Sequence, residues 1–342
     1  MRKLEYVIKR SASAVFVLLG VSLVTFVMTR IVPSNPAALY IGPRARPEDI
    51  ARVTEQMGLN DPVWSQYATY LGQLLRGDWG TSIATRRPVL EELFGRLPAT
   101  LELLVVAMVV ATLGGIAIGA FSARWRGRRA DLAARSFSLV GVSLPAFWLG
   151  MLLQILFFRN LGWFPLSGRI DPDLRFIDPV DPVTGFLLID SVLGGTWTAL
   201  QSASWHLVLP ALTLAAFPMG LIARMTRATM LETLEQDFIR TSTAYGLSER
   251  SIVYRYALKN SLGPTVSVLG LSLAYALTGS FFVEVIFNWP GLGMFTVRSL
   301  LNLDHPAILG VTLLGAVTYI AINMVVDLVN AWIDPRISLE TV

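Results

Sequence analysis

Six long apolar segments dominate this sequence, and each meets or approaches the length that a helix needs to cross a lipid bilayer. They cover residues 11–32, 99–122, 136–158, 207–223, 264–287 and 308–331. A helical span needs about 20 residues to cross a hydrocarbon core of about 30 Å. Lipid offers no hydrogen-bond partners, so each segment must pair its own backbone groups, as a helix does. The sequence therefore predicts an all-α integral membrane protein with six transmembrane helices.

Charged residues make up only 15% of the chain, against about 25% in soluble domains, and the basic ones gather in alternate connections between the apolar segments. One set comprises Arg2, Lys3, Lys9, Arg10, Arg124, Arg126, Arg128, Arg129, Arg135, Arg224, Arg227, Arg240, Arg250, Arg255, Lys259 and Arg336. The short opposite connections hold only Arg159, Arg169, Arg175 and Arg298. Basic residues mark the cytoplasmic side, and long loops such as 33–98 count little. Both termini should therefore be cytoplasmic, and the net charge of +4 predicts no nucleic-acid partner.

The apolar segments divide the chain into one membrane domain with a single large external loop. The predicted order is a cytoplasmic segment 1–10, a first span 11–32, an external loop 33–98 with short helices, a five-helix core 99–331 that includes a cytoplasmic loop 224–263, and a cytoplasmic tail 332–342. The first span is expected to be a retained anchor, because its apolar run is too long for a signal peptide and no A-x-A site follows it. Cysteine is absent, which excludes disulfides and thiolate metal sites.

Two short helices are predicted in the external loop. Pro47 favours a helix over 48–57, and Gly58 should end it. Asp61 is the expected N-cap of a second helix, with Pro62 at its first position. The apolar residues of this second helix recur at helical spacing. They are expected to pack the loop onto the spans, and a face that docks a partner is the alternative.

The loop 159–206 is rich in aspartate, which raises the question of a metal site. The five residues are Asp171, Asp173, Asp178, Asp181 and Asp190. Their spacing lacks the regular order of a calcium-binding loop. Solvated turns are therefore the expected role of these aspartates.

The cytoplasmic loop 224–263 has the pattern of two short helices joined by a sharp turn. Asp237 to Tyr245 reads as a helix, and Gly246 suits the left-handed position that ends it. Ser248 is the expected cap of a second helix, whose apolar face is formed by Ile252, Val253, Tyr256 and Ala257. The residues alone leave two interpretations open: a rigid knuckle that projects from the membrane, or an amphipathic loop that lies on the lipid surface.

Residues 240–248 read Arg-Thr-Ser-Thr-Ala-Tyr-Gly-Leu-Ser and are followed by Leu262-Gly263-Pro264. This stretch resembles the EAA loop of binding-protein-dependent ABC importer permeases, closest to the peptide/nickel branch. Ser242 stands where that branch typically has alanine, and Tyr245 stands where it commonly has a basic residue. Further pieces that resemble the family, in order along the chain, are Tyr6–Arg10, Pro33–Ala37, Gly58–Pro62, Gly77–Ser82, Ser143–Trp148, Pro182–Asp190, Phe287–Gly293 and Asp334–Arg336.

The resemblance implies an ABC importer type I permease-like fold in which the knuckle is a coupling helix that docks on an ATPase. The docking residues it implies are Asp237, Arg240, Thr241, Ser242, Ala244, Gly246, Leu247 and Ser248. It further implies a second homologous permease subunit, two ATPase subunits that carry ATP and Mg, and an external binding protein that delivers dipeptides or oligopeptides. Nickel, glutathione and haem are the alternative substrates. The expected location is the bacterial inner membrane, with transport by alternating access.

The chain has no site of its own for ATP. A P-loop needs Gly-Lys-Ser/Thr, and the only lysines, Lys3, Lys9 and Lys259, follow Arg2, Ile8 and Leu258. We therefore expect no cofactor and no catalytic residue in this chain, and ATP hydrolysis on another polypeptide.

Two other classes of membrane protein compete with this interpretation. A secondary transporter usually carries ionisable groups at mid-membrane, and the candidates Glu102, Glu284 and Asp327 all lie near the ends of spans, where anchoring or helix pairing is expected instead. A membrane enzyme would have to use His206 or His305, which are the only histidines and which flank spans without a catalytic motif. His206 is expected to form an interfacial pair with its aromatic neighbour Trp205.

Small residues lie inside two of the predicted spans. Gly114, Gly115 and Gly119 fall in the second span, and Gly141 precedes Pro145 in the third. Small residues let helices approach closely. Packing is the expected role of these residues, and a hinge along a translocation path is the alternative.

Overall fold

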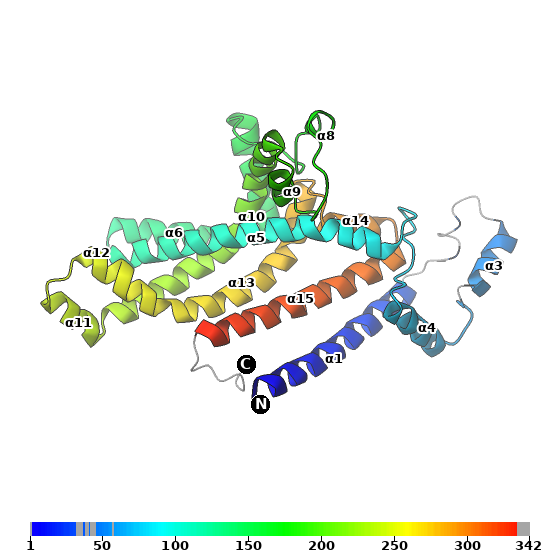
Figure 1. The fold of residues 1–342 in the computed structure, drawn as a ribbon, viewed down its shortest axis with the longest axis horizontal. Helices are drawn as coiled ribbons and strands as arrows, with labels where there is room; N and C mark the ends of the chain where they lie inside the picture. The colour runs from blue at the N-terminus through cyan, green and yellow to red at the C-terminus, as the bar shows by residue number, and fades with distance from the viewer. Residues whose placement is uncertain (1, 32–36, 38–40, 42–45, 57, 334–342) are drawn as a thin grey trace. The chain divides into compact units, whose positions relative to one another are not determined.

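The computed structural model describes residues 2–31, 37, 41, 46–56 and 58–333. The chain divides into two compact units (Figure 1). One comprises Met1–Leu97 with Met294–Ile320, and the other comprises Pro98–Gly293 with Ala321–Val342. The described residues are predominantly helical, as predicted. The predicted motifs at 33–36 and 334–336 and the side chain of Asp327 lie outside the described residues.

The first unit is built from the N-terminal helices and from parts of three others. Its elements are α1 (Arg2–Ile31), α3 (Pro47–Gln56), α4 (Val63–Leu75), the start of α5 (Val89–Arg124), most of α14 (Leu292–Leu301) and the first half of α15 (His305–Ile333). Phe26 of α1 lies 5.4 Å from the ring of Tyr67 and 5.8 Å from that of Tyr70. The apolar face of α4 thus packs on α1, as expected for this loop.

The two predicted loop helices are present, but one of their caps is wrong. Gly58, two positions after the last residue of α3, has a φ of +60°, as the prediction requires. Pro62, not Asp61, is the N-cap of α4, and no side chain caps this helix. The backbone explains the difference, because Pro62 has an extended ψ of 140° and its carbonyl accepts hydrogen bonds from the amides of Ser65 and Gln66.

A carboxylate fixes the start of α15. Asp304 is fully buried and accepts hydrogen bonds from the Ser82 hydroxyl at 2.5 Å and from the Ala84 amide at 3.1 Å. It also accepts the Ala307 amide at 3.3 Å, which satisfies an otherwise unpaired N–H of the helix. The segment before α5 is thereby tied to the beginning of α15.

The second unit contains the remaining helices. They are the rest of α5, α6 (Arg129–Ser143), α7 (Ala146–Leu153), η1 (Gln154–Asn160), α8 (Leu174–Ile177), α9 (Leu187–Leu193), α10 (Trp197–Leu234), α11 (Asp237–Ala244), α12 (Glu249–Ser251), η2 (Ile252–Ala257) and α13 (Leu258–Ile286). The long helix α10 is central, because it packs against α6, α7, α9 and α13. Figure 1 shows α5, α6, α10 and α13 side by side, with α11 and α12 at one end.

Glycine lets these helices approach closely. A methyl group added at Gly119 of α5 would lie 2.6 Å from the Ala223 carbonyl oxygen of α10. One added at Gly220 of α10 would lie 2.5 Å from the Ser138 carbonyl oxygen of α6, and one at Gly141 would lie 2.8 Å from that of Ala216. Each distance is too short for a real contact, so the packing role expected of Gly119 and Gly141 is confirmed. The hinge role stays a prediction.

The predicted third span, 136–158, is not one continuous helix. Helix α6 ends at Ser143, and the next helix starts at Ala146 with its axis bent by 112°. The cause is Pro145, because proline pushes the preceding residue out of the helical region. Leu144 accordingly has a ψ of 132°.

Within the described residues, three helices are long and apolar enough to cross a membrane, or up to five if each of two bent pairs forms one span. The three are α5, α10 and the part of α15 from His305 to Val325. Helix α10 extends beyond the predicted span 207–223 at both ends, and α5 begins before residue 99. Helix α1 is 30 residues long and includes the apolar stretch Ser13–Met28. The count of six spans therefore stays a prediction.

Candidate functional site

Residues 237–251 form a helix, a sharp turn and a second helix at one end of the second unit, as predicted. Helix α11 runs from Asp237 to Ala244, and Gly246 follows it with a φ of +77°, which glycine adopts without strain. Ser248 caps the next helix, because its hydroxyl accepts the Ser251 amide at 3.4 Å. We call residues 237–251 the elbow.

The elbow is seated on an apolar cluster. Ile239 is the buried side chain of α11, and it packs in a cluster with Ile252, Val253 and Ala257, which the sequence predicted as an apolar face. Ala120, Ala123 and Met230 complete the buried part of this cluster. These residues come from α5 and α10, so the elbow is held by the helices on which it stands.

The two ends of the elbow continue into two long helices. Only Glu235 and Gln236 separate α10 from α11, and the second helix runs without a break through η2 into α13. Helices α10 and α13 pack extensively against each other. The elbow is therefore continuous in the chain with two helices that pack against each other in the second unit.

The outer face of the elbow is exposed. Among the docking residues that the sequence predicted, Ser242 is half-buried and the rest are exposed; the exposed ones are Asp237, Arg240, Thr241, Ala244, Gly246, Leu247 and Ser248. Tyr245 is 84% exposed at the turn. An exposed aromatic ring beside small residues is a surface that fits a protein partner.

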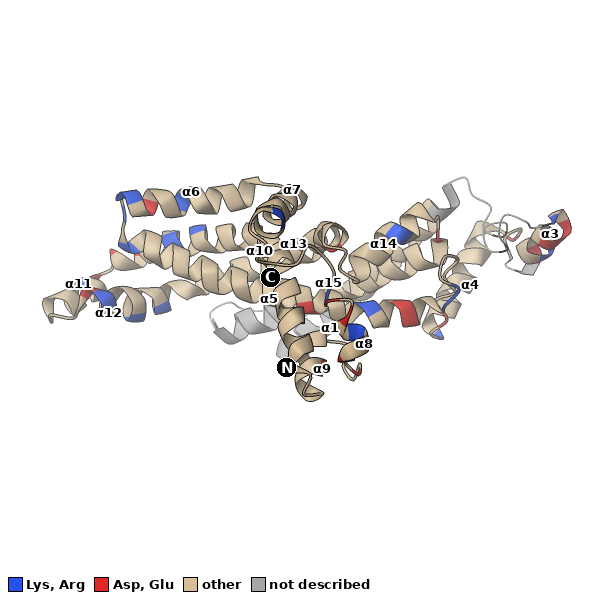
Figure 2. Cartoon of the chain, turned by 90° about the horizontal axis from the view of Figure 1, so that it is seen from above, with Lys and Arg blue, Asp and Glu red and all other residues tan. Residues whose placement is uncertain are grey.

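One ion pair joins the elbow to the neighbouring basic loop, and a second joins that loop to the residues just before the elbow. Arg124 donates to Glu249 at 3.2 Å, and Arg126 donates to Glu235 at 2.7 Å. Basic residues gather on α6, α12 and their neighbours at this end of the second unit (Figure 2). Each pair is partly or fully exposed, so solvent screens it and it contributes little to stability.

A buried carboxylate that the sequence analysis missed lies beneath this loop. Asp131 of α6 is 1% exposed and accepts two hydrogen bonds from Arg227 of α10, at 2.9 and 3.0 Å. It also accepts the Ser122 hydroxyl of α5 at 2.6 Å and the Gly127 amide at 3.0 Å. One carboxylate thus joins three helices. The available signal was a single acidic residue within an arginine-rich connection.

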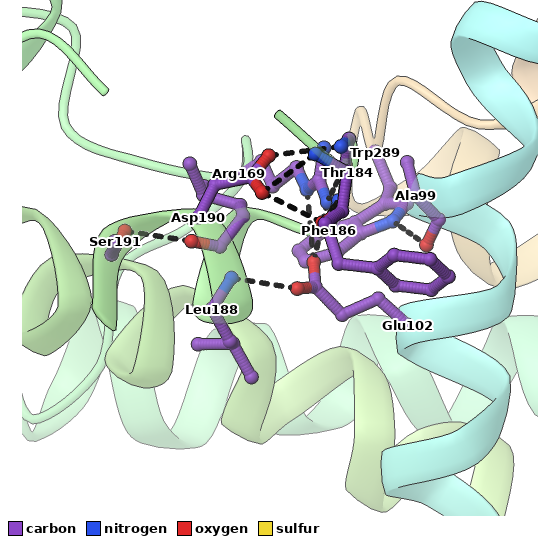
Figure 3. A network of polar contacts seen from close by, with 11 residues as sticks. Ala99, Glu102, Arg169, Thr184, Phe186, Leu188, Asp190, Ser191 and Trp289 are labelled. Atoms are coloured by element: carbon purple, nitrogen blue, oxygen red, sulfur yellow. Dashed lines mark hydrogen bonds and ion pairs between the residues drawn. The ribbon is translucent and has the colours of Figure 1, made fainter. Parts of the chain in front are cut away.

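The other end of the second unit contains a network around Glu102 (Figure 3). Its carboxylate accepts two hydrogen bonds from Arg169, at 2.6 and 3.0 Å, and one from the Leu188 amide at 2.8 Å. Arg169 also donates to the Gly185 carbonyl oxygen at 3.0 Å. Sequence reasoning allowed Glu102 either interfacial anchoring or helix pairing. The structure favours pairing, because Glu102 is only 5% exposed.

Glu284 is engaged in a similar way. It is fully buried in α13 and accepts the Thr100 hydroxyl of α5 at 2.7 Å and the Gly293 amide at 2.6 Å. Nearby, the Trp289 indole donates to the Ala99 carbonyl oxygen at 2.8 Å, as Figure 3 shows. Glu102 therefore holds the loop around Arg169 and the start of α9 to α5, and Glu284 joins α13 to α5 and to the start of α14.

Two expectations for the loop 159–206 are corrected. Asp190 is 3% exposed rather than solvated, and it accepts hydrogen bonds from the Thr184 hydroxyl and from the amides of Thr184 and Gly185. Burial raises the pKa of Asp190, but these hydrogen bonds outweigh it and the pKa lies below its ordinary value. His206 is buried beside Ser202 rather than interfacial, whereas its neighbour Trp205 is exposed as expected.

With this geometry established, comparison with known proteins identifies the class of protein. The family model described as binding-protein-dependent transport system inner membrane component matches residues 115–339, and the model for the N-terminal part of such components matches residues 3–104. The chain belongs to this family. It is a permease of the ABC importer type, and the resemblance seen in the EAA-like segment is confirmed.

Curated relatives match this permease along nearly its whole length. The probable D,D-dipeptide transport system permease protein DdpB of Escherichia coli (strain K12) is 44% identical over 96% of this chain and 96% of its own. The dipeptide transport system permease protein DppB of Alkalihalophilus pseudofirmus is 39% identical over 98% and 99%. The glutathione transport system permease protein GsiC of Salmonella choleraesuis is 38% identical over 98% and 99%.

Proposed function

We propose that this permease forms half of a transmembrane path for dipeptides or short oligopeptides, and that its elbow receives the power stroke from a separate ATPase. The observation that carries the proposal is an exposed elbow surface on a buried seat, continuous with α10 and α13. A rigid helix that is anchored at its base transmits force to the helices behind it. A mobile loop would absorb the same force.

The partners follow from the family to which the chain belongs and from the lack of an ATP site in the sequence. No Gly-Lys pair exists in the sequence, so ATP and Mg²⁺ are bound by two partner ATPase subunits. A second, homologous permease completes the path, and an external binding protein delivers the substrate. The membrane is the bacterial inner membrane, crossed by six spans with both termini and the elbow on the cytoplasmic side.

Transport proceeds by alternating access. Closure of the ATPases moves the two elbows of the permease pair together and opens the helix bundle outward. Hydrolysis resets the bundle inward. A ligand shifts such an equilibrium only through different affinities for its two states, so nucleotide must favour one spacing of the elbows.

A peptide substrate is supported by the dipeptide permeases that match this chain along almost its entire length. Glutathione is the second candidate, because a glutathione permease matches nearly as well. Nickel and haem are the remaining alternative substrates. Ligand identification on the cognate external binding protein distinguishes the two: a bound dipeptide supports the proposal, and bound glutathione replaces it.

A secondary transporter is the alternative from another class. Its usual mark is an ionisable group available at mid-membrane, whereas Glu102 and Glu284 are both engaged in hydrogen bonds. Uptake into proteoliposomes separates the classes. We expect uptake by the assembled complex to require internal ATP and to survive an uncoupler, and the reverse result would refute the proposal.

The elbow is tested by crosslinking, which the absence of cysteine makes direct. Ala244→Cys in the assembled complex should crosslink to a cysteine in the docking cleft of the ATPase. Ser204→Cys is the matched control, because Ser204 is equally exposed on α10 but lies toward the opposite end of that helix from the elbow. Failure of cysteines throughout 240–248 to crosslink in an active complex would rule out the coupling role.

A further inference from the structure

A cavity of about 290 Å³ lies between α5, α6 and α10, at the same end of the second unit as the elbow. Most of its wall is apolar and includes Ile118 of α5 and Leu139 and Val142 of α6. This volume is at the lower end of the about 300–1,000 Å³ of small-molecule sites. It therefore accommodates part of an elongated apolar ligand.

The cavity belongs to a tightly packed seam. Gly119 and Gly220 both line it, and each allows a backbone contact between neighbouring helices that a methyl group would block. Asp131 clamps the same helices beside the cavity through Arg227 and Ser122. Because the helices are closely packed on both sides of the cavity, its walls have a defined shape.

The cavity combines its apolar wall with an excess of positive charge. Arg135, Arg224 and Arg227 line it, and basic residues are visible on α6 and its neighbours in Figure 2. Asp131 is the carboxylate that faces them, with Arg227 at 2.9 Å and Arg135 at 3.5 Å. Within the described part of the chain, Arg224 makes no ion pair, and its side chain is exposed.

We propose that this cavity binds an anionic phospholipid, with the phosphate on Arg224 and Arg135 and one acyl chain against the apolar wall. Guanidinium groups bind phosphate through paired hydrogen bonds, and basic pockets between transmembrane helices hold anionic headgroups on the cytoplasmic side. The apolar wall distinguishes a lipid from a free phosphate ion. The assignment to the cytoplasmic leaflet rests on the topology given under the proposed function.

The bound lipid has a structural consequence. It fills the seam between α6 and α10, and α10 leads directly into the elbow. Anionic lipid therefore stabilises the helices that support the elbow. The transporter should consequently depend on the lipid composition of the membrane.

Native mass spectrometry tests the headgroup part of the proposal. The complete transporter is purified from nanodiscs that contain phosphatidylcholine with phosphatidylglycerol, and the retained phosphatidylglycerol is counted. Arg224→Gln should lower retention about fivefold, as expected for one arginine beside an anionic lipid. The matched control is Arg129→Gln, because Arg129 is exposed in the same helix as Arg135 but does not line the cavity. Equal retention by the two variants would overturn the proposal.

A second pair of variants tests the acyl-chain part and keeps every charge. Ala134→Phe fills the cavity, whereas Ala133→Phe places the same ring on the neighbouring exposed position outside it. We expect loss of retained phosphatidylglycerol only for Ala134→Phe. Displacement of the lipid by inorganic phosphate alone would assign the site to a free anion and overturn the proposal. Failure of the elbow to crosslink would leave this lipid count unaffected, so the two proposals fail separately.

Discussion

The two ends of the second unit use charged residues in opposite ways. At the elbow, Asp237 and Arg240 pair at 3.3 Å while remaining 94% and 76% exposed. At the other end, Glu102 and Arg169 pair at 2.6 Å and are 5% and 15% exposed. An exposed pair contributes about 0–1 kcal/mol, whereas loss of one partner from a buried pair costs about 3–5 kcal/mol.

This difference separates residues that hold the fold from residues that are free for a partner. The Glu102 network satisfies buried groups from three segments, so its carboxylate and the Arg169 side chain serve to hold the fold. The elbow satisfies its hydroxyls within its own helix and leaves Tyr245 and its small residues uncovered. The comparison predicts that substitutions will change stability at one end and coupling at the other.

The largest effect on stability is expected from Glu102→Ala. The substitution leaves Arg169 without its carboxylate and the Leu188 amide without an acceptor, and should lower the free energy of unfolding in detergent by about 3–5 kcal/mol. Asp237→Ala removes one carboxylate from the exposed pair and should change it by less than about 1 kcal/mol. Thermal unfolding of the purified complex measures both, and equal losses would abolish the contrast between the two ends.

The next largest difference in stability is expected between alanine substitutions at Gly185 and at Gly246, which have similar φ angles. Gly185 and Gly246 have φ values of +81° and +77°, so alanine at either position costs about 1–2 kcal/mol of strain. A methyl group at Gly185 would also lie 2.8 Å from Pro98, whereas nothing lies within 4 Å at Gly246. Gly185→Ala should therefore be the more destabilising by about 1–3 kcal/mol. Similar melting temperatures of the two variants would show that the loop near Pro98 moves to accommodate the added methyl group.

A matched pair of threonine substitutions gives a smaller, pH-dependent effect. Thr184→Val removes a donor to the Asp190 carboxylate and should cost about 1–2 kcal/mol near pH 7. Hydrogen bonds lower the folded pKa of Asp190, so this stabilisation is complete above its unfolded pKa of about 3.9 and is lost as the pH falls through the folded pKa.

The stability difference between wild type and Thr184→Val should therefore shrink as the pH falls below about 4. Thr243→Val is the control in the elbow, because the Thr243 hydroxyl donates only to the Ile239 carbonyl oxygen of its own helix. Melting temperatures measured from about pH 7 down to about pH 3 test this trend, because the range extends below the unfolded pKa of about 3.9. A constant difference would mean that Asp190 does not carry the effect.

The smallest effect on stability, and a large effect on transport, is expected from Tyr245→Ala. Tyr245 is 84% exposed and should contribute less than about 0.5 kcal/mol to folding. If the elbow docks an ATPase, this variant should retain its melting temperature but lose substrate-stimulated ATP hydrolysis by the complex. A stable variant with undiminished stimulation would show that the ring at the turn takes no part in docking.

The elbow could be predicted from sequence because its structure is local. The ends of α11, the turn at Gly246 and the cap at Ser248 all depend on residues within a few positions of one another. The apolar face also follows from helical spacing, and Ile252, Val253 and Ala257 are buried as expected. Ile239 is buried in the same apolar cluster and also follows helical spacing, although the sequence pattern alone did not single it out.

The buried networks could not be predicted, because the burial of Asp190 and the arginine partner of Asp131 both depend on how the helices pack. Asp190 reads as one of several solvated aspartates until the fold buries it over the turn at Thr184 and Gly185. Asp131 pairs with Arg227, which lies 96 positions away. No spacing rule links such residues, and only the packing of α6 against α10 brings them together.

The sequence alone determined the class of protein and the elbow, since apolar length, basic residues and capping motifs act through lipid and the local backbone. The tertiary structure decided which charges are buried, where the third span breaks, and that α5, α6 and α10 enclose a cavity beside three arginines. Burial depends on what covers a side chain, and that covering comes from segments far away in the chain.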